Sequence, residues 1–252
     1  MTIDIDFLSW SEARTTVYDL AVLPWGATEP HNYHLPYTTD NLLSRSVSLE
    51  AAKKASEQGV NSMVLPAIPF GSQNPGQTDL LFCIHARQET QKAILTDIVA
   101  SLHRQGLHKL LILNGHGGNN FRTLIRDILV DYPGFMIVVS DWYKLADGTK
   151  YFAEPGDHAG ELETAMMMHF FPERVKDKSV FGKGESKKFI IDSLNNGFWT
   201  PRHWTQVSSD TGIGNPIHAT PEKGRSFTEA VTGIVAQFIV DFARADPNDM
   251  YR

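Results

Sequence analysis

Two carboxylates and two imidazoles occur in this chain at positions that could bind a metal ion. Glu29, His31 and Asp40 lie in the run WGATEPHNYHLPYTTDN, and His116 lies far downstream in LNGHGGNN. Carboxylate oxygens and imidazole nitrogens are the ligands that ions such as Zn²⁺ accept, and catalytic sites leave one coordination position open to water. The set therefore predicts a metal-dependent hydrolase.

Each residue also has a simpler interpretation. Asp40 directly precedes a helical pattern, where an aspartate is most often an N-cap, and Thr38 or Thr39 could share that task. His31 and His34 could be exposed loop histidines, because a pair of the form E-x-H often arises by chance. NGHGGNN could be a tight turn whose glycines supply positive φ before a helix N-terminus that holds an anion.

The elements that must position these side chains alternate between short apolar runs and longer amphipathic ones. Strands are predicted at 16–23, 64–65, 108–114 and 134–141. Helices are predicted at 41–57, 88–105, 121–130, from about 160, and at 222–244. Apolar strands separated by helices predict an α/β fold with a mostly parallel sheet covered on both faces. Between about 172 and 220 the periodicity weakens, and long loops with a hairpin are expected.

The polar residues follow the predicted strands. Glu29 and His31 come after the first strand, His116 after the strand at 108–114, and His158 after the strand at 134–141. Ligands of open α/β sheets bind beyond the carboxyl ends of the strands, and side chains two residues apart on an extended backbone face the same side. His158 could merely begin a helix, with acidic residues in its first turn. The joint occurrence at equivalent strand ends favours one site.

Length and composition fit one domain over residues 1–252. The chain has 29 acidic and 23 basic residues, a net charge of −6 and 42% hydrophobic residues, with no repeat or linker that would divide it. No block of Lys and Arg forms the stripe that nucleic acid requires, so no nucleic-acid partner is expected.

The start of the chain, MTIDIDFLSW, lacks the positive and apolar regions of a signal peptide. No run of about eighteen or more apolar residues follows, so a cytoplasmic location without a membrane partner is expected. The single cysteine, Cys83, excludes an intramolecular disulfide and is expected to be a buried, inert thiol in the stretch LLFCI.

Four stretches, EPHNYHLPYTTD, NGHGGNN, HAGELETAM and DTGIGNPIHATPEKG, resemble the signature stretches of the creatininase (creatinine amidohydrolase) family, in the same order and over nearly the whole chain. The resemblance implies a three-layer α/β/α sandwich, a homohexamer and hydrolysis of C–N bonds in cyclic amides, formamides or peptides. It implies two divalent ions held by Glu29, His31, Asp40 and His116, with Asp40 as the bridge. The mixed nitrogen and oxygen ligands favour Zn first, and Mn or Fe(II) suits the same set. His158 matches the catalytic histidine that shuttles the proton.

One departure from the family removes a metal ligand. The namesake enzyme reads NGHYEN, and its glutamate completes the second metal site, whereas this chain has Gly118 there. By resemblance, Glu163 in the HAG-x-x-E signature is the expected replacement ligand and joins His158 at the reaction centre. In the first signature, Pro30-His31-Asn32 stands where the family commonly has Gln-His-Gly.

Other departures concern the substrate. Gly117 and Gly118 replace an aromatic and an acidic side chain, and Glu154 aligns with a mobile tryptophan of the namesake. These changes predict a wider, less apolar pocket in which creatinine is a poor substrate. The expected activity is metal-dependent hydrolysis of a non-peptide C–N bond in a small amide, formamide or cyclic amide.

Three alternatives stay open. The chain could be a peptidase-like maturation enzyme of the same family, or a non-catalytic binder of a metal or small molecule on the same fold. It could also be an interaction protein whose late aromatic residues, Phe198, Trp199 and Trp204, dock a partner. For these aromatic residues a subunit interface is the plainer explanation.

Overall fold

A parallel sheet forms the centre of the computed structural model, which describes residues 2–247 and 249–251. Within these residues the sheet has four strands in the order β2-β1-β3-β4. The strands are β1 (Leu20–Trp25), β2 (Ser62–Val64), β3 (Lys109–Asn114) and β4 (Met136–Asp141), and every neighbouring pair is parallel. All residues of β1 and β2 are buried, in agreement with their apolar sequences.

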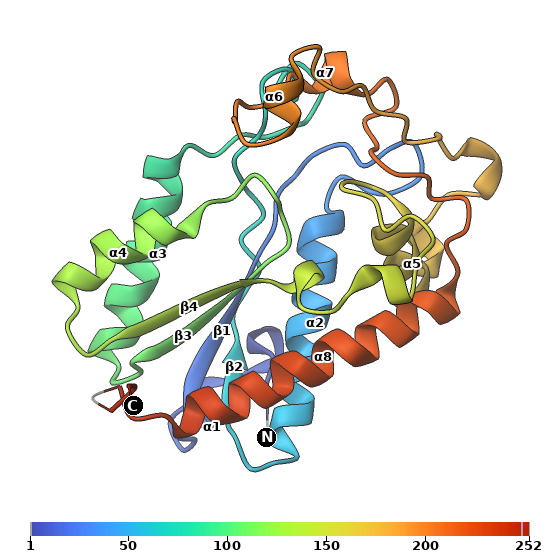
Figure 1. Ribbon diagram of the computed structural model, residues 1–252. Helices are drawn as coiled ribbons and strands as arrows, with labels where there is room; N and C mark the ends of the chain where they lie inside the picture. Colours follow the sequence, from blue (N-terminus) through green and yellow to red (C-terminus); the bar gives the residue numbers. More distant parts are fainter. Residues whose placement is uncertain (1, 248, 252) are drawn as a thin grey trace.

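Helices cover both faces of the sheet (Figure 1). α3 (Gln88–Arg104) and α4 (Phe121–Asp131) lie on one face, and α2 (Thr39–Ser56), α5 (Glu161–Phe170) and α8 (Pro221–Arg244) lie on the other. Alternate residues of β1 divide between the two cores, with Leu23 packed towards α3 and α4 and Val22 towards α2 and α8. The predicted three-layer α/β/α sandwich is therefore confirmed.

α8 is the longest helix of the described chain and the one there that is long and apolar enough to cross a membrane. Half of the most apolar 18-residue stretch of this helix is buried, and Phe227, Val231 and Ile239 are completely inaccessible to solvent. They pack in the same core as α2 and α5. The helix therefore has the packing of a core helix of the sandwich.

The remaining elements of the described chain are short. They are η1 (Ile5–Phe7), α1 (Trp10–Ala13), η2 (Trp142–Lys144), η3 (Gly148–Lys150), η4 (Pro172–Arg174), η5 (Lys178–Val180), α6 (Asp192–Asn195) and α7 (Trp204–Val207). The prediction of a hairpin between 172 and 220 is wrong. In that described segment a single isolated antiparallel β-bridge joins Ser186 to Ser208, and no strand forms on either side of it. The carboxylate of Asp210 instead accepts hydrogen bonds from the backbone N–H groups of Gly184 and Gly212. These bonds hold the loops together in place of β-sheet pairing.

β1 begins four residues later than predicted. Leu20 pairs with Ser62, the first residue of β2, and the residues before Leu20 have no neighbouring strand to pair with in the described chain. Val17 is accordingly 80% exposed despite its high β-propensity. The other long elements agree with the prediction to within about two residues, the usual uncertainty of element ends.

Candidate metal centre

Six acidic and imidazole side chains gather beyond the carboxyl ends of the strands. The loop after β1 contributes two, the turn after β3 one and the loop before α5 one, and the first turns of α2 and α5 contribute one carboxylate each. The six are Glu29, His31, His116, His158, Asp40 and Glu163. All are buried except Glu163, which is partly buried. The structure thus brings every site residue predicted from the sequence into one place.

Asp40 is not the N-cap of α2. Thr38 occupies the cap position, and Asp40 is the second residue of the helix, with its side chain turned into the cluster. Its Oδ1 lies 2.9 Å from Nε2 of His31, and its Oδ2 lies 3.2 Å from Nδ1 of His116. The two oxygens of Asp40 therefore face two different imidazoles.

The first subsite consists of Glu29, Asp40 and His116, whose ligand atoms all lie within 4.8 Å of one another. His116 donates Nε2–H to the carbonyl oxygen of Ser72 at 2.7 Å, so in the neutral ring Nδ1 carries a lone pair. That nitrogen is 2.9 Å from Oε1 of Glu29, and Oε1 of Glu29 and Oδ2 of Asp40 have no hydrogen-bond partner among the described residues. Buried lone pairs that converge in this way fit a divalent cation.

The second subsite consists of His31, Asp40 and Glu163, again within 4.8 Å of one another. Nδ1–H of His31 donates to the backbone oxygen of Glu29 at 3.0 Å, which in the neutral ring leaves the Nε2 lone pair facing Asp40. One oxygen of Glu163 accepts the backbone N–H of Ala159 at 2.5 Å. Asp40 belongs to both subsites, as a bridging carboxylate must.

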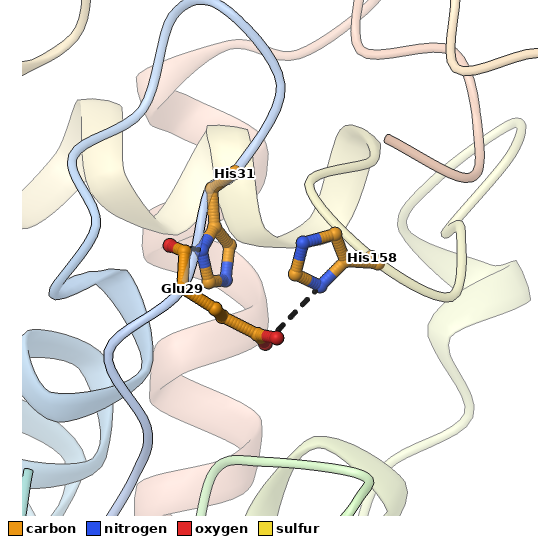
Figure 2. A group of neighbouring side chains, drawn as sticks. All are labelled: Glu29, His31 and His158. Carbon is orange, nitrogen blue, oxygen red and sulfur yellow. Dashed lines mark hydrogen bonds and ion pairs between the residues drawn. The ribbon is translucent and has the colours of Figure 1, made fainter. Parts of the chain in front are cut away.

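His158 lies beside Glu29 of the first subsite and His31 of the second (Figure 2). Its Nε2–H donates to the backbone oxygen of Pro30 at 2.8 Å, and its Nδ1 is 3.5 Å from Oε1 of Glu29. Its ring centroid is 4.2 Å from that of His31, and the ring of Trp204 contacts it edge-on at 5.2 Å. The imidazole is therefore held in one orientation, with one nitrogen turned towards the carboxylates.

The buried carboxylates of the site are stable only next to compensating positive charge. Burial lowers the pKa of His31, but the charge and hydrogen bond of Asp40, together with the charges of Glu163 and Glu29, outweigh burial and raise this pKa to about 10. Burial raises the pKa of Glu163 to about 7, against the opposing charge of His31. In the absence of metal, protons on His31 and His116 neutralise these carboxylates, and bound divalent ions would replace those protons.

Several residues near the centre were not singled out from the sequence. Gln77, which is 1% exposed, donates from its side-chain amide to Oε2 of Glu29. The carbonyl group of Ser72 holds His116. Neither residue carries a sequence signal, because a glutamine and a backbone carbonyl in a loop match no metal-site pattern.

Asn32 follows the candidate ligand His31 and stands where the family that the sequence resembles commonly has glycine. Its φ is 55°, in the left-handed region that asparagine tolerates better than most residues. Its side-chain oxygen accepts the N–H groups of Tyr33 and Gly182, and its side-chain nitrogen donates to the carbonyl of Gly182. These hydrogen bonds tie the loop that carries His31 to the loop at 182.

Two further residues differ from the simpler interpretations. His34 is 1% exposed, and its Nε2 forms a hydrogen bond of 2.8 Å with the hydroxyl of Thr164, so neither His31 nor His34 is an exposed loop residue. The expectation of a buried thiol is wrong for Cys83, which is only half-buried and lies in a loop. Burial raises the pKa of its thiol to about 12, so it is protonated at neutral pH.

A cavity of about 1120 Å³ opens above the cluster. Gly117, Gly118 and Tyr143 line its walls, and the segment 189–204 contributes aromatic residues including Trp199 and Trp204. Trp199 is 85% exposed, whereas Trp204 is 3% exposed and packs on His158. The cavity is wide, and its lining mixes polar with aromatic side chains.

A parallel α/β sheet with overlapping carboxylate–histidine sets at its carboxyl edge is typical of metal-dependent hydrolases. The profile of the creatininase family, described as creatinine amidohydrolase, matches residues 6–239. The chain therefore belongs to the creatininase family, whose members are hydrolytic amidohydrolases.

Individual relatives span the chain. A Bacteroides fragilis protein that provisionally carries the name creatinine amidohydrolase is 47% identical, with a TM-score of 0.94 and 99% of this chain and 98% of that chain covered. Creatinine amidohydrolase of Pseudomonas putida is 25% identical over 67% of this chain and 72% of its own length. A mycofactocin precursor peptide peptidase of Mycobacterium ulcerans is 25% identical over 91% of this chain and 88% of its own length.

Solved creatininases include one named for its manganese form and one variant named as a Zn–Zn type. They are 20% and 21% identical to this chain, with a TM-score of 0.78 in both cases, and show the shared fold.

Proposed function

We propose that the protein is an amidohydrolase that uses two divalent ions to cleave a C–N bond of an amide, formamide or cyclic amide. Glu29, Asp40 and His116 would hold one ion, and His31, Asp40 and Glu163 would hold the other. The observation that carries the proposal is the position of Asp40, whose two oxygens face the imidazoles of His31 and His116. Zinc fits the mixed nitrogen and oxygen ligands, and Mn²⁺ or Fe²⁺ suits the same set.

Two bound ions would polarise the scissile carbonyl and lower the pKa of a water molecule towards neutrality. The protein's part is to keep the ligands deprotonated and oriented. Each of the three histidines donates one ring N–H to a backbone carbonyl, which fixes its tautomer and aims the other nitrogen at the cluster. The site is thus preorganised by contacts to the carbonyls of Glu29, Ser72 and Pro30.

His158 is the proposed proton carrier. Burial and the neighbouring charge of His31 lower its pKa, so the ring is neutral at pH 7. Nδ1 can then accept a proton on the side of Glu29 and deliver it to the departing nitrogen. General acid–base catalysis of this kind contributes about 10²- to 10⁴-fold in rate.

The cavity supports a substrate larger than a single five-membered ring. Its volume of about 1120 Å³ exceeds the roughly 300–1,000 Å³ of ordinary ligand sites. A peptide is the second candidate, because the exposed Trp199 extends the cavity lining outwards and the mycobacterial relative is a peptide peptidase. A homohexamer and a cytoplasmic location stay predictions.

The proposal is tested by turnover. Metal-free protein reloaded with Zn²⁺, Mn²⁺ or Fe²⁺ is offered N-formyl compounds, cyclic ureides and short peptides, and the released amine is measured. Hydrolysis of one class that disappears on chelation is expected, as is its loss in His158→Gln with the metal content retained. Hydrolysis by folded, metal-free protein would contradict the proposal. Binding of two ions without turnover of any class would favour a non-catalytic binder.

A further inference from the structure

A buried glutamine outside the ligand set contacts one ligand directly. The side-chain amide of Gln77 donates a hydrogen bond of 2.5 Å to Oε2 of Glu29. The carbonyl oxygen of the same side chain accepts the backbone N–H of Asn74 at 2.7 Å. Because both ends of the amide are occupied, its NH₂ group is fixed towards Glu29 and its oxygen is fixed away from it.

This hydrogen bond gives the two oxygens of Glu29 different surroundings. Oε2 has a neutral donor, whereas Oε1 is buried without a hydrogen bond among the described residues. Oε1 lies 2.9 Å from Nδ1 of His116 and 3.5 Å from Nδ1 of His158. Glu29 therefore presents one oxygen, Oε1, to the first subsite, and Gln77 determines which one.

The loop 72–77 also holds a second ligand of the same subsite. The carbonyl oxygen of Ser72 accepts Nε2–H of His116 at 2.7 Å. Within the described residues no hydrogen bond or ion pair joins this loop to His31 or Glu163, the two residues that belong only to the second subsite. The loop thus forms hydrogen bonds with Glu29 and His116 of the first subsite, and in the described structure with neither His31 nor Glu163 of the second.

We propose that Gln77 is a positioning residue that sets the metal affinity of the first subsite and not of the second. The inference rests on the proposed two-ion centre. Replacing the amide by an apolar side chain removes the only donor to Oε2 in the described structure, so that Glu29 can rotate or turn Oε2 into the subsite. Supporting contacts of this kind change metal affinity by about 10- to 100-fold.

The test measures Zn²⁺ binding to the metal-free, full-length protein by competition with a chromophoric chelator. Gln77→Leu should weaken one of two Zn²⁺ sites by about 10- to 100-fold and leave the other unchanged. Gln77→Glu keeps an acceptor for Asn74 but places an oxygen against Glu29, and it should weaken the same site at least as much. Gln88→Leu is the matched control, because Gln88 also lines the cavity but donates to the hydroxyl of Ser72.

Glu163→Gln identifies which site has changed. If Gln77 acts on the first subsite, the double variant Gln77→Leu/Glu163→Gln is weakened at both sites. A double variant that keeps one site of wild-type affinity would overturn the proposal, as would two wild-type sites in both Gln77 variants. Thermal unfolding of each metal-free variant checks its fold. Wild-type protein that binds fewer than two ions would instead contradict the two-ion centre itself.

Discussion

Gly118 lies against the backbone of Ser72. A Cβ atom at Gly118 would come 2.6 Å from Nε2 of His116 and closer still to the carbonyl oxygen of Ser72. This carbonyl accepts the hydrogen bond that orients His116. A glutamate ligand at this position therefore has no room beside this loop, which supports the proposal that Glu163 on α5 supplies the carboxylate of the second subsite.

We expect Gly118→Ala to disturb both stability and metal binding. The added methyl group forces the Ser72 loop away from His116, and overpacking of this kind costs about 1–3 kcal/mol. Gly117→Ala is the control, because its Cβ would lie 3.6 Å from the hydroxyl oxygen of Tyr143, an ordinary contact. Urea unfolding and Zn²⁺ titration measure both effects, and equal behaviour of the two variants would contradict the close approach.

Replacing two neighbouring glutamates should separate metal binding from stability. Glu163→Gln should lower the metal content from two ions towards one with the fold intact. Glu161→Gln should leave the metal content unchanged, because Glu161 pairs with Lys223 at the start of α8 and accepts the N–H of Glu154. Losing a charged hydrogen bond there costs about 1.5–3 kcal/mol of stability. Elemental analysis and thermal unfolding distinguish the two effects, and equal metal loss would mean that the wrong carboxylate is assigned.

The buried His34 should make the protein acid-sensitive. Burial lowers its pKa to about 4, below the unfolded value of about 6.5, so its contribution to stability is complete above pH 6.5 and is lost as the pH falls towards 4. The loss reaches up to about 3 kcal/mol, from about 1.4 kcal/mol per pKa unit. His34→Gln can still bond Thr164 but does not titrate, so its Tm should fall less steeply between pH 6.5 and 4. An identical slope in both proteins would refute this assignment.

Creatinine should be a poor substrate. The cavity is far larger than the ring, and Gly117 and Gly118 add no side chain to sandwich it. Interactions that would discriminate creatinine at the transition state are thereby missing. Steady-state kinetics with Zn²⁺- and Mn²⁺-loaded protein should give a kcat/KM well below about 10⁴ M⁻¹s⁻¹, the lower end of the ordinary enzyme range. A value at or above that range would contradict the argument.

The sequence predicted those parts of the fold and site that depend on local patterns. The helix expected at 88–105 is Gln88–Arg104, and the strand expected at 108–114 is Lys109–Asn114, because their apolar periodicity is uninterrupted. The convergence of Glu29, His116 and His158 follows from their positions after parallel strands. Family resemblance, not periodicity, supplied the role of Glu163.

The features that escaped prediction depend on contacts between distant segments. Gln77 reaches Glu29 only because the loop 72–77 folds over the end of β1, and the backbone N–H of Trp204 binds the carbonyl of Pro75 to hold that loop. The segment 189–204 lines the cavity, although its sequence has no regular hydrophobic periodicity. Such arrangements are set by tertiary packing, which no local window of sequence reports.

Anomalous diffraction from crystals of the Zn²⁺-loaded protein tests the central claim most directly, since it locates each ion relative to Asp40. We expect two zinc peaks, one among Glu29, Asp40 and His116 and one among His31, Asp40 and Glu163. Asp40→Ala should lose both ions, whereas loss of a mere helix cap would cost only about 0.5–2 kcal/mol of stability and keep the metal. A single peak, or peaks that persist in Asp40→Ala, would contradict a centre bridged by Asp40.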